Sequence, residues 1–439
     1  AAFGIFVTPG ATFGNAIGFN GGQELNQFVK SARPGQQVTL IGTGLGAVSG
    51  DEKNPVAVQD VAADVKVFVA GKAAEVVSKG RVGLNEIANG DSLKLPRGLS
   101  AVDQVTFTVP DGVTGCAASV AVQIGERMSN WATLSVAPEG GVCADLAGLG
   151  DLNQYYTSEP LKVGSISMIR TAIGLELGPL GSLNINTDAG SASFFKNAAV
   201  GVPASALTFS PVSTGQCIAV VGQIADVDGP DEEPEEISEG TPLDAGEALR
   251  IQGPKGVREL KKVSTGNYAD SLGTGSDTAL PFPVPIPGGG KEPFLDPGEY
   301  TVDNGAGGAD IGAFQVKARV SAPLNWTNRA QITAVTRANG VDVTWTGAEP
   351  GSFVMIVGFS SNGNANASFY CIADAAAGRI NVPSQVLLRL PASGAPAGPE
   401  AATGALFVAN TNGVKVDIPG LDLAVFSTGV LSGKTLPYR

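Results

Sequence analysis

The sequence predicts an all-β protein built from tandem β-sandwiches, and three observations lead to this fold class. Short runs rich in Val, Ile, Phe and Thr recur along the chain, each bounded by Gly, Pro or Asp, which is typical of sandwich strands. The 439 residues include 60 Gly and 28 Pro, which favour many turns over long helices. Hydrophobic residues make up 43% of the chain, enough to form real cores. A chain of this length predicts about two to four domains.

The charge and the residue types exclude several classes of function. A net charge of −13 disfavours binding to nucleic acid or to an anionic membrane surface. No apolar run approaches the roughly 18 residues of a membrane span, so we expect no membrane insertion. The chain contains no His, which excludes Ser-His-Asp and Cys-His catalysis and any His-liganded metal. The sequence therefore predicts a protein that is not an enzyme.

The first residue and the cysteines favour an extracellular location. The chain begins with Ala and shows no signal region, which fits a mature secreted protein with its signal removed; an excised fragment would look the same. Four Cys in such a chain predict two disulfides. We favour Cys116–Cys143, because these residues flank two strands of one expected hairpin, and Cys217–Cys371 follows by elimination. The alternative is four buried free thiols.

An apolar strand is expected at the start of the chain. Phe3, Ile5 and Val7 alternate, so they lie on one face of this strand. One interpretation is that the strand edges its own domain. The other is that it is an assembly strand, which inserts into the sheet of a neighbouring subunit. Further on, residues 21–33 have apolar residues at helical spacing and predict a short helix.

Four motifs between residues 34 and 136 resemble a known domain. They are PGxxVTLxGTGLG at 34–46, VxVxVxGxxAxVV at 65–77, VTFTVPxGVxG at 105–115 and SNWATLSV at 129–136. Together they resemble the IPT/TIG immunoglobulin-like domain. This resemblance implies tandem immunoglobulin-like β-sandwiches. Two stretches, 47–63 and 79–102, are longer than the short form of that domain needs, and we expect them to be surface loops.

The whole chain also resembles a type of secreted protein from Acidobacteria-like soil bacteria, in which an IPT-like domain precedes further β-rich modules. Besides the motifs above, the resemblance rests on runs at 241–246, 295–302, 308–314 and 343–347. It implies export rather than an activity.

Three domains are expected along the chain. Residues 1–147 form the IPT/TIG-like sandwich with its N-terminal strand. Residues 148–320 form a β-rich middle region with an acidic loop and a second sandwich. Residues 321–439 form a C-terminal immunoglobulin-like sandwich, in which Trp345 resembles the core tryptophan of such domains. A disulfide between Cys217 and Cys371 would join the last two regions and blur the boundary between them.

The acidic loop is a weak candidate for a metal site. Asp226, Asp228 and Asp231 offer three carboxylates within six positions, and Ca²⁺ prefers several oxygen ligands. The spacing differs from that of an EF-hand, and a solvated loop explains such a run more often. Apart from this Ca²⁺ candidate, the sequence predicts no cofactor and no catalytic residue.

Aromatic side chains are weak candidates for stacking against sugars. Tyr155, Tyr156 and Trp326 are the positions considered, although core packing usually takes Trp. Carboxylate pairs for glycoside hydrolysis have no marked position in the sequence.

The leading hypothesis is an extracellular structural or interaction protein, a self-assembling subunit of a filament or surface layer at the cell surface. Subunits would form a homo-polymer through strand addition or sheet-edge contacts. The alternative is a monomeric secreted carbohydrate-binding or adhesion protein that recognises surface glycans. A hydrolase that uses only carboxylates ranks last.

Overall fold

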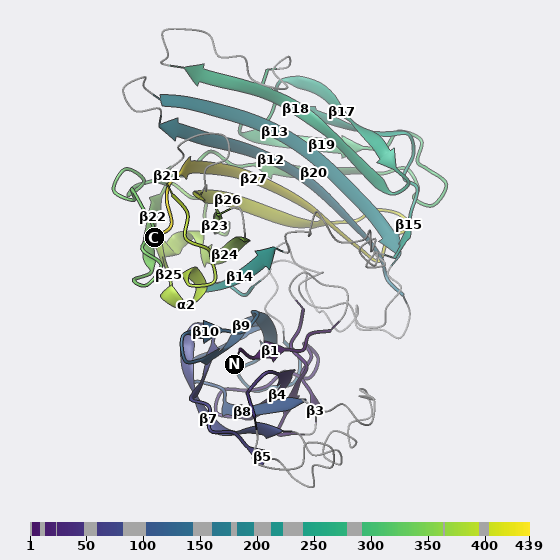
Figure 1. Ribbon diagram of the computed structural model, residues 1–439. Coiled ribbons are helices and arrows are strands. Elements are labelled where there is room, and N and C mark those ends of the chain that lie inside the picture. Colours follow the sequence, from purple (N-terminus) through teal and green to yellow (C-terminus); the bar gives the residue numbers. More distant parts are fainter. Residues whose placement is uncertain are drawn as a thin grey trace, which may run out of the picture.

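The protein folds into two β-rich lobes, which Figure 1 shows one above the other. The computed structural model describes residues 2–8, 14–22, 24–47, 59–81, 102–143, 160–176, 182–196, 212–222, 240–278, 292–362, 365–394 and 404–439. The N-terminal lobe comprises the described residues up to 143, and the large lobe comprises those from 160 onward. Strands dominate both lobes, which confirms the all-β fold class. Within the described residues, no helix is both long and apolar enough to span a membrane.

The N-terminal lobe is a sandwich in which β4 pairs with β8 and β6 pairs with β9. Its described strands are β1 (Gly4–Ile5), β2 (Gly18–Asn20), β3 (Glu24–Leu25), β4 (Gln37–Thr43), β5 (Gln59–Asp60), β6 (Val65–Val69), β7 (Lys72–Arg81), β8 (Asp103–Thr108), β9 (Gly115–Ile124), β10 (Arg127–Met128) and β11 (Ala132–Val136). Inward-facing residues such as Val38, Val67 and Phe107 are fully buried in its core, as the alternating pattern of each strand requires.

The N-terminal strand lies within its own lobe, as the first of the two interpretations expects. β1 pairs antiparallel with β4, and the side-chain amide of Asn130 binds the backbone N–H and C=O of Ile5. Phe3 and Ile5 belong to the core of the lobe, and Val7 is half-buried against it. Burial of these apolar side chains favours a strand that edges its own domain over an assembly strand that inserts into the sheet of a neighbouring subunit.

The described residues of 21–33 form strand β3, turns and short bridges rather than the predicted helix. Two asparagines organise them: Asn26 donates to Asn20 at 2.9 Å, and Asn20 donates to the backbone of Lys30 at 2.7 Å. Asn26 also bonds to the backbone of Ser135 on β11. Side-chain bonds of this kind compete with helical backbone bonds, which explains why the helical spacing was misleading.

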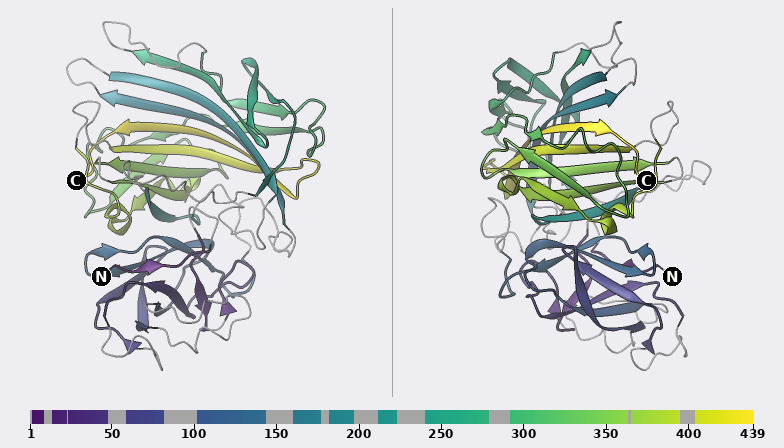
Figure 2. Two further views of the ribbon diagram at one scale, coloured as in Figure 1. Left: turned by 45° about the vertical axis from the view of Figure 1, so that its right-hand side comes forward. Right: turned by 90° about the vertical axis from the view of Figure 1, so that its left-hand side faces the viewer.

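The large lobe is built on one long sheet. Its described strands are β12 (Lys162–Glu176), β13 (Ser182–Lys196), β14 (Gln216–Gly222), β15 (Thr241–Pro242), β16 (Ala248–Gly253), β17 (Gly256–Ser264), β18 (Asn267–Thr278), β19 (Gly298–Asp303), β20 (Gln315–Val320), β23 (Phe353–Ser361), β24 (Asn366–Asp374), β26 (Gly404–Val416) and β27 (Leu423–Thr435). The order is β14-β24-β23-β26-β27-β12-β13-β18-β17-β16-β19-β20, with β15 beside β13. Figure 2 shows β12, β13, β26 and β27 as long curved neighbours.

This sheet crosses the domain boundary expected at residue 320. β12 pairs parallel with β27, and β14 pairs antiparallel with β24, so the middle region and the C-terminal region share one continuous sheet. The sheet also folds back on itself, because the Thr428 hydroxyl on β27 donates to the Arg319 carbonyl on β20 at 2.6 Å. A core that includes Met168 and Phe426 fills the space between the two parts of the sheet.

A smaller sheet covers the other end of the large lobe. It consists of β21 (Asn325–Trp326), β22 (Val341–Thr346) and β25 (Arg379–Val382), accompanied by the short helices η4 (Ala375–Ala377) and α2 (Ser384–Leu387). Trp345 is buried in the core beneath it and donates to the Ala375 carbonyl at 2.9 Å. The predicted Cys217–Cys371 disulfide is formed in the same core, between directly paired residues of β14 and β24.

The two lobes meet through specific hydrogen bonds. The backbone N–H of Ser213 donates to the Ala117 carbonyl on β9 at 3.0 Å, and the backbone N–H of Ala117 donates to the Ser213 hydroxyl, also at 3.0 Å. The Gln216 side chain accepts from the backbone N–H of Ser119 at 2.8 Å. The predicted Cys116–Cys143 disulfide is also formed, within an apolar cluster that spans both lobes. That cluster comprises Phe28, Cys116, Cys143, Leu161, Leu423 and Val425.

Candidate functional site

A cavity of about 520 Å³ lies in the large lobe, beside the long strands β12, β13, β26 and β27. Its polar lining comes from Arg170, Asn186, Lys255, Glu292, Asp296 and Ser432. Its other lining residues are Ala172, Gly275, Pro293, Pro323, Leu324, Val408, Val430 and Leu431. The cavity lining therefore combines charged groups, an amide and a hydroxyl with aliphatic side chains.

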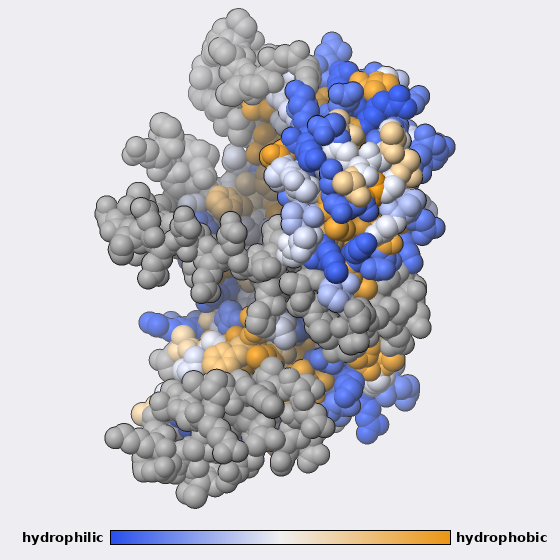
Figure 3. All heavy atoms as spheres, turned by 90° about the vertical axis from the view of Figure 1, so that its right-hand side faces the viewer, coloured by the Kyte–Doolittle hydropathy of each residue, from blue (hydrophilic) through white to orange (hydrophobic). Residues whose placement is uncertain are grey.

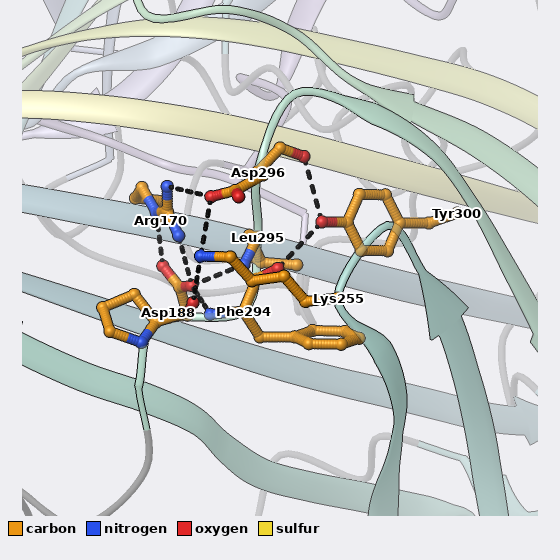
Figure 4. Close-up of polar contacts among 8 residues, drawn as sticks. Arg170, Asp188, Lys255, Phe294, Leu295, Asp296 and Tyr300 are labelled. Carbon is orange, nitrogen blue, oxygen red and sulfur yellow. Dashed lines mark hydrogen bonds and ion pairs between the residues drawn. The ribbon is translucent and has the colours of Figure 1, made fainter.

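An ion pair between neighbouring strands forms the base of the charged side. Arg170 on β12 and Asp188 on β13 stand directly opposite each other in the register. The Arg170 guanidinium donates from Nε and Nη2 to the two carboxylate oxygens of Asp188, each at 2.7 Å (Figure 4). The Asp188 side chain is fully buried, and its hydrogen bond raises the pKa of Arg170. The two charges thus neutralise each other in a bidentate geometry.

The same carboxylate holds the loop segment 292–296 against the sheet. One oxygen of Asp188 accepts the backbone N–H groups of Phe294 and Leu295, both at 2.6 Å (Figure 4). Gly273 on β18 allows the segment 292–296 to lie this close to the sheet, since a Cβ atom at position 273 would collide with the Glu292 carbonyl. The φ angle of Gly273 is +144°, which also favours glycine. Asp188 is therefore an anchor for one wall of the cavity.

Lys255 and Tyr300 complete the wall. The Lys255 ammonium lies 3.0 Å from Asp296 and donates to the Pro293 carbonyl at 2.8 Å. The Tyr300 hydroxyl lies 3.0 Å from both the Phe294 and the Asp296 carbonyl oxygens, where it donates. Burial, together with the nearby Asp296 charge, raises the pKa of Tyr300 to about 12. Tyr300 therefore remains a neutral hydrogen-bond donor over the whole physiological pH range.

The charged groups of this wall are paired with one another or with the backbone. Arg170 binds Asp188, and Lys255 binds Asp296 and the Pro293 carbonyl. The exposed ends of Lys255 and Asp296, about 40% accessible each, remain available to a polar ligand. In the part of the chain that the structure describes, no three metal-ligating side chains gather.

The structure places the sequence-predicted sites elsewhere. Trp326 is buried in the core beneath the small sheet, where its Nε1 donates to Asn328 at 3.0 Å, so its proposed role as an exposed sugar platform is wrong. The Trp326 side chain is packed in the core because burial of its indole ring removes a large apolar area from water. The candidate calcium ligands Asp226, Asp228 and Asp231 lie outside the described residues, as do Tyr155 and Tyr156.

The Arg170–Asp188 pair was not predicted, although the sequence carries a signal for it. Arg170 is the only charged residue between Val163 and Leu175, and Asp188 is the only one between Leu183 and Phe195. Two lone charges of opposite sign, equally distant in sequence from Pro179, indicate a pair across a hairpin.

Comparisons with known proteins identify no family. No family model matches the chain, and no curated protein matches it. One similar solved structure is a Bacteroides ovatus surface glycan-binding protein from a mixed-linkage glucan utilization locus, in complex with a heptasaccharide. It is 9% identical to this chain, with a TM-score of 0.16, and the match covers 82% of this chain and 71% of that one. The I9–I11 tandem of titin is 10% identical with a TM-score of 0.12, covering 92% and 95%. The BSP domain of a biofilm-associated protein is 11% identical with a TM-score of 0.11, covering 97% and 82%. Similarities at this level carry no argument about function.

Proposed function

We propose that this chain is a non-catalytic structural or interaction protein of the cell exterior. The observation that carries this proposal is the junction of the two lobes, where the Cys116–Cys143 disulfide lies in an apolar cluster shared by both. The Cys217–Cys371 disulfide joins the edge strand of the large sheet to its neighbour. Disulfides persist in oxidising compartments, and two of them in one continuous body suit a protein that keeps its shape outside the cell.

The finer proposal is that the chain is a subunit of a filament or surface layer. Low charge density, 16% of residues, and a Gly-rich composition support repeated contact between copies. The two edges of the large sheet are protected against strand addition: β20 carries Lys317 and Arg319, both more than half exposed, and the N-terminal lobe contacts β14. We therefore place the subunit contact on a sheet face rather than on an edge of the large sheet.

The terminal strand gives a direct test of the original assembly mechanism. Strand exchange would first have to extract Phe3 and Ile5 from their own core. We expect deletion of residues 1–9 to lower the melting temperature of the N-terminal lobe, because it removes buried apolar surface. A deletion variant that melts like the full chain but no longer assembles would restore strand exchange.

Electron microscopy of native material from the producing cells, with antibody labelling of this chain, tests the proposed function. The expected result is labelled, ordered assemblies at the cell exterior, with multimers in size-exclusion chromatography of the extracted material. Label confined to the cell interior would overturn the proposal.

The cavity favours a second candidate function, a carbohydrate-binding or adhesion protein. Asn186 and Ser432 can exchange hydrogen bonds with hydroxyl groups, while Leu324 and Val430 offer an apolar wall for the C–H face of a sugar. A glycan array with the full chain is the first test. Any hit should weaken in Asn186→Ala but not in Asn184→Ala, the neighbouring Asn on the same face of β13 that is outside the cavity lining. An array without hits removes this candidate.

A further inference from the structure

The floor of the cavity is one row of paired residues across four strands of the large sheet. In this row Ser432 on β27 pairs with Ala172 on β12, Ala172 with Asn186 on β13, and Asn186 with Gly275 on β18. Paired residues lie on the same side of a sheet, so polar and small side chains alternate across the floor. Gly275 lets the Pro293 ring close one end of the row, because a Cβ atom at position 275 would lie 2.9 Å from that ring.

Three polar side chains of the lining form no hydrogen bond with any described residue: Asn186, Ser432 and Glu292. The amide of Asn186 and the hydroxyl of Ser432 can each donate and accept, whereas the carboxylate of Glu292 can only accept. Asn186 and Ser432 are two strand spacings apart, which is roughly 10 Å. A ligand that satisfies all three side chains therefore carries several hydroxyl groups and a further donor for the carboxylate.

The charged groups around the cavity leave one negative charge uncompensated. The two cations Arg170 and Lys255 are opposed by three carboxylates, those of Asp188, Asp296 and Glu292, which gives a sum of −1. Glu292 is exposed and forms no ion pair within the described part of the chain. The whole chain has a net charge of −13 as well. The cavity therefore attracts a cationic ligand and disfavours a carboxylated, sulfated or phosphorylated one.

Aliphatic side chains supply the apolar part of the lining. Leu324 and Val430 are buried there, whereas hydrophilic residues cover much of the side of the molecule that Figure 3 shows. The volume of about 520 Å³ lies within the range of small-molecule sites, roughly 300–1,000 Å³. None of the described residues that line the cavity is aromatic, so ring stacking does not contribute and charge has a larger share in selecting the ligand.

We propose that the cavity binds a sugar with a free ammonium group, that is, a glycan that contains a hexosamine without its N-acetyl group. The ammonium group lies at the Glu292 carboxylate, and ring hydroxyl groups exchange hydrogen bonds with Asn186 and Ser432. The C–H groups of the ring pack against Leu324 and Val430. A lysine side chain of a peptide would bring the positive charge but no hydroxyl groups for Asn186 and Ser432, which favours the amino sugar.

This inference rests on the second candidate function, carbohydrate binding, and names the class of carbohydrate. It makes the charge of the ligand, rather than the shape of its ring, the property that the cavity selects.

Calorimetric titration of the full chain with two disaccharides tests the inference. One is the β-1,4-linked disaccharide of glucosamine, and the other is the same disaccharide with both amino groups acetylated, so the ammonium groups are the difference between them. We expect the glucosamine disaccharide to bind at least about tenfold more tightly, because a charged donor strengthens the bond to a carboxylate. Its affinity should fall as salt is added, and fall again as the pH rises through the pKa of the ligand amine.

Glu292→Gln is the variant that tests the position of the ammonium group. We expect it to bind the glucosamine disaccharide about tenfold more weakly than the wild type, because the amide keeps an acceptor but loses the charge. Glu259→Gln on β17 is the matched control, since Glu259 is also exposed and lies outside the cavity lining. Its affinity should equal that of the wild type, and equal melting temperatures would show that both variants fold.

The outcomes separate this inference from the candidate function on which it rests. A neutral glycan that binds more tightly than the glucosamine disaccharide, and that Asn186→Ala weakens, would overturn the inference and leave carbohydrate binding standing. Binding of the glucosamine disaccharide that Glu292→Gln leaves unchanged would also overturn it. A trilysine peptide that binds as tightly as the disaccharide would assign the cavity to a basic peptide instead. An array without any glycan hit removes the candidate function together with the inference.

Discussion

Arg170 and Asp188 face each other across the β12–β13 hairpin, joined by two hydrogen bonds of 2.7 Å. The Asp188 carboxylate also accepts two backbone N–H groups from the segment 292–296, so its oxygens receive four hydrogen bonds in a site without solvent exposure. One buried carboxylate thus fixes a strand pair and a loop at once. The cavity wall depends on this single side chain, and its removal is the sharpest test of the site.

Asp188→Asn should destabilise the large lobe strongly. The amide group can accept on one oxygen only, and its NH₂ group would face donors, so the Arg170 charge would lose its partner in a buried site. Breaking a buried ion pair in this way costs about 3–5 kcal/mol. Denaturation followed by tryptophan fluorescence measures the effect.

The matched control for that experiment is Glu299→Gln on β19. Glu299 pairs with Lys317 at 2.8 Å, but both side chains are about 60% exposed. We expect no measurable change in its unfolding midpoint. An Asp188→Asn variant as stable as this control would show that the buried pair does not anchor the wall.

Gly273→Ala should displace the segment 292–296 and lower stability by more than backbone strain alone. Its φ of +144° is unfavourable for Ala, and the added Cβ would meet the Glu292 carbonyl. Gly256→Ala is the control, because Gly256 has a φ of +97° but no atom within 4 Å of the added Cβ. The control should lose about 1–2 kcal/mol from strain. Equal melting temperatures for the two variants would rule out the close approach.

Stability should fall at high pH through Tyr300. Its pKa is about 12 in the folded protein and about 10 in an unfolded chain, so the contribution of Tyr300 is complete below pH ~10 and is lost as pH rises toward ~12. Burial also raises the pKa of Tyr268 and Tyr438, so tyrosinate absorbance should show a late component to which Tyr300 contributes and which is smaller in Tyr300→Phe. The unfolding midpoint should decline over the same range. In Tyr300→Phe that part of the decline should vanish; a decline of identical size in the variant would assign it to other groups.

Removing the two disulfides should have unequal effects. The loop-entropy model gives about 3.5 kcal/mol for the separation of 27 residues between Cys116 and Cys143, and about 5 kcal/mol for the 154 residues between Cys217 and Cys371. Thermal scans of the paired Cys→Ala variants compare them. The ranking would be contradicted if the Cys116/Cys143 variant melted at the lower temperature.

Local sequence patterns were sufficient for many strands and for one cysteine pair, and the second pair, Cys217–Cys371, followed only by elimination. Val38–Ile41, Val65–Val69 and Val105–Val109 alternate or stay apolar over strand length, and each lies in or at the end of a strand of the N-terminal lobe. The Cys116–Cys143 pair followed from the ends of one hairpin, since residues that close a hairpin are near each other in space whatever surrounds them. The helical spacing at 21–33 failed because the Asn20 and Asn26 side chains found partners in β11 and nearby backbone.

The sequence by itself determined the all-β class, the absence of histidine chemistry and the closeness of Cys116 to Cys143, because these depend on composition and on contacts within one or two neighbouring strands. Only the tertiary structure decided which strands became neighbours over long distances. The parallel pairing of β12 with β27 joins residues about 260 positions apart and erases the boundary expected at residue 320. The same pairing places Ile173 opposite Gly433 and in one row with Phe407. No local period encodes such a pairing, since its free energy comes from burying a shared core after the chain has closed a long loop.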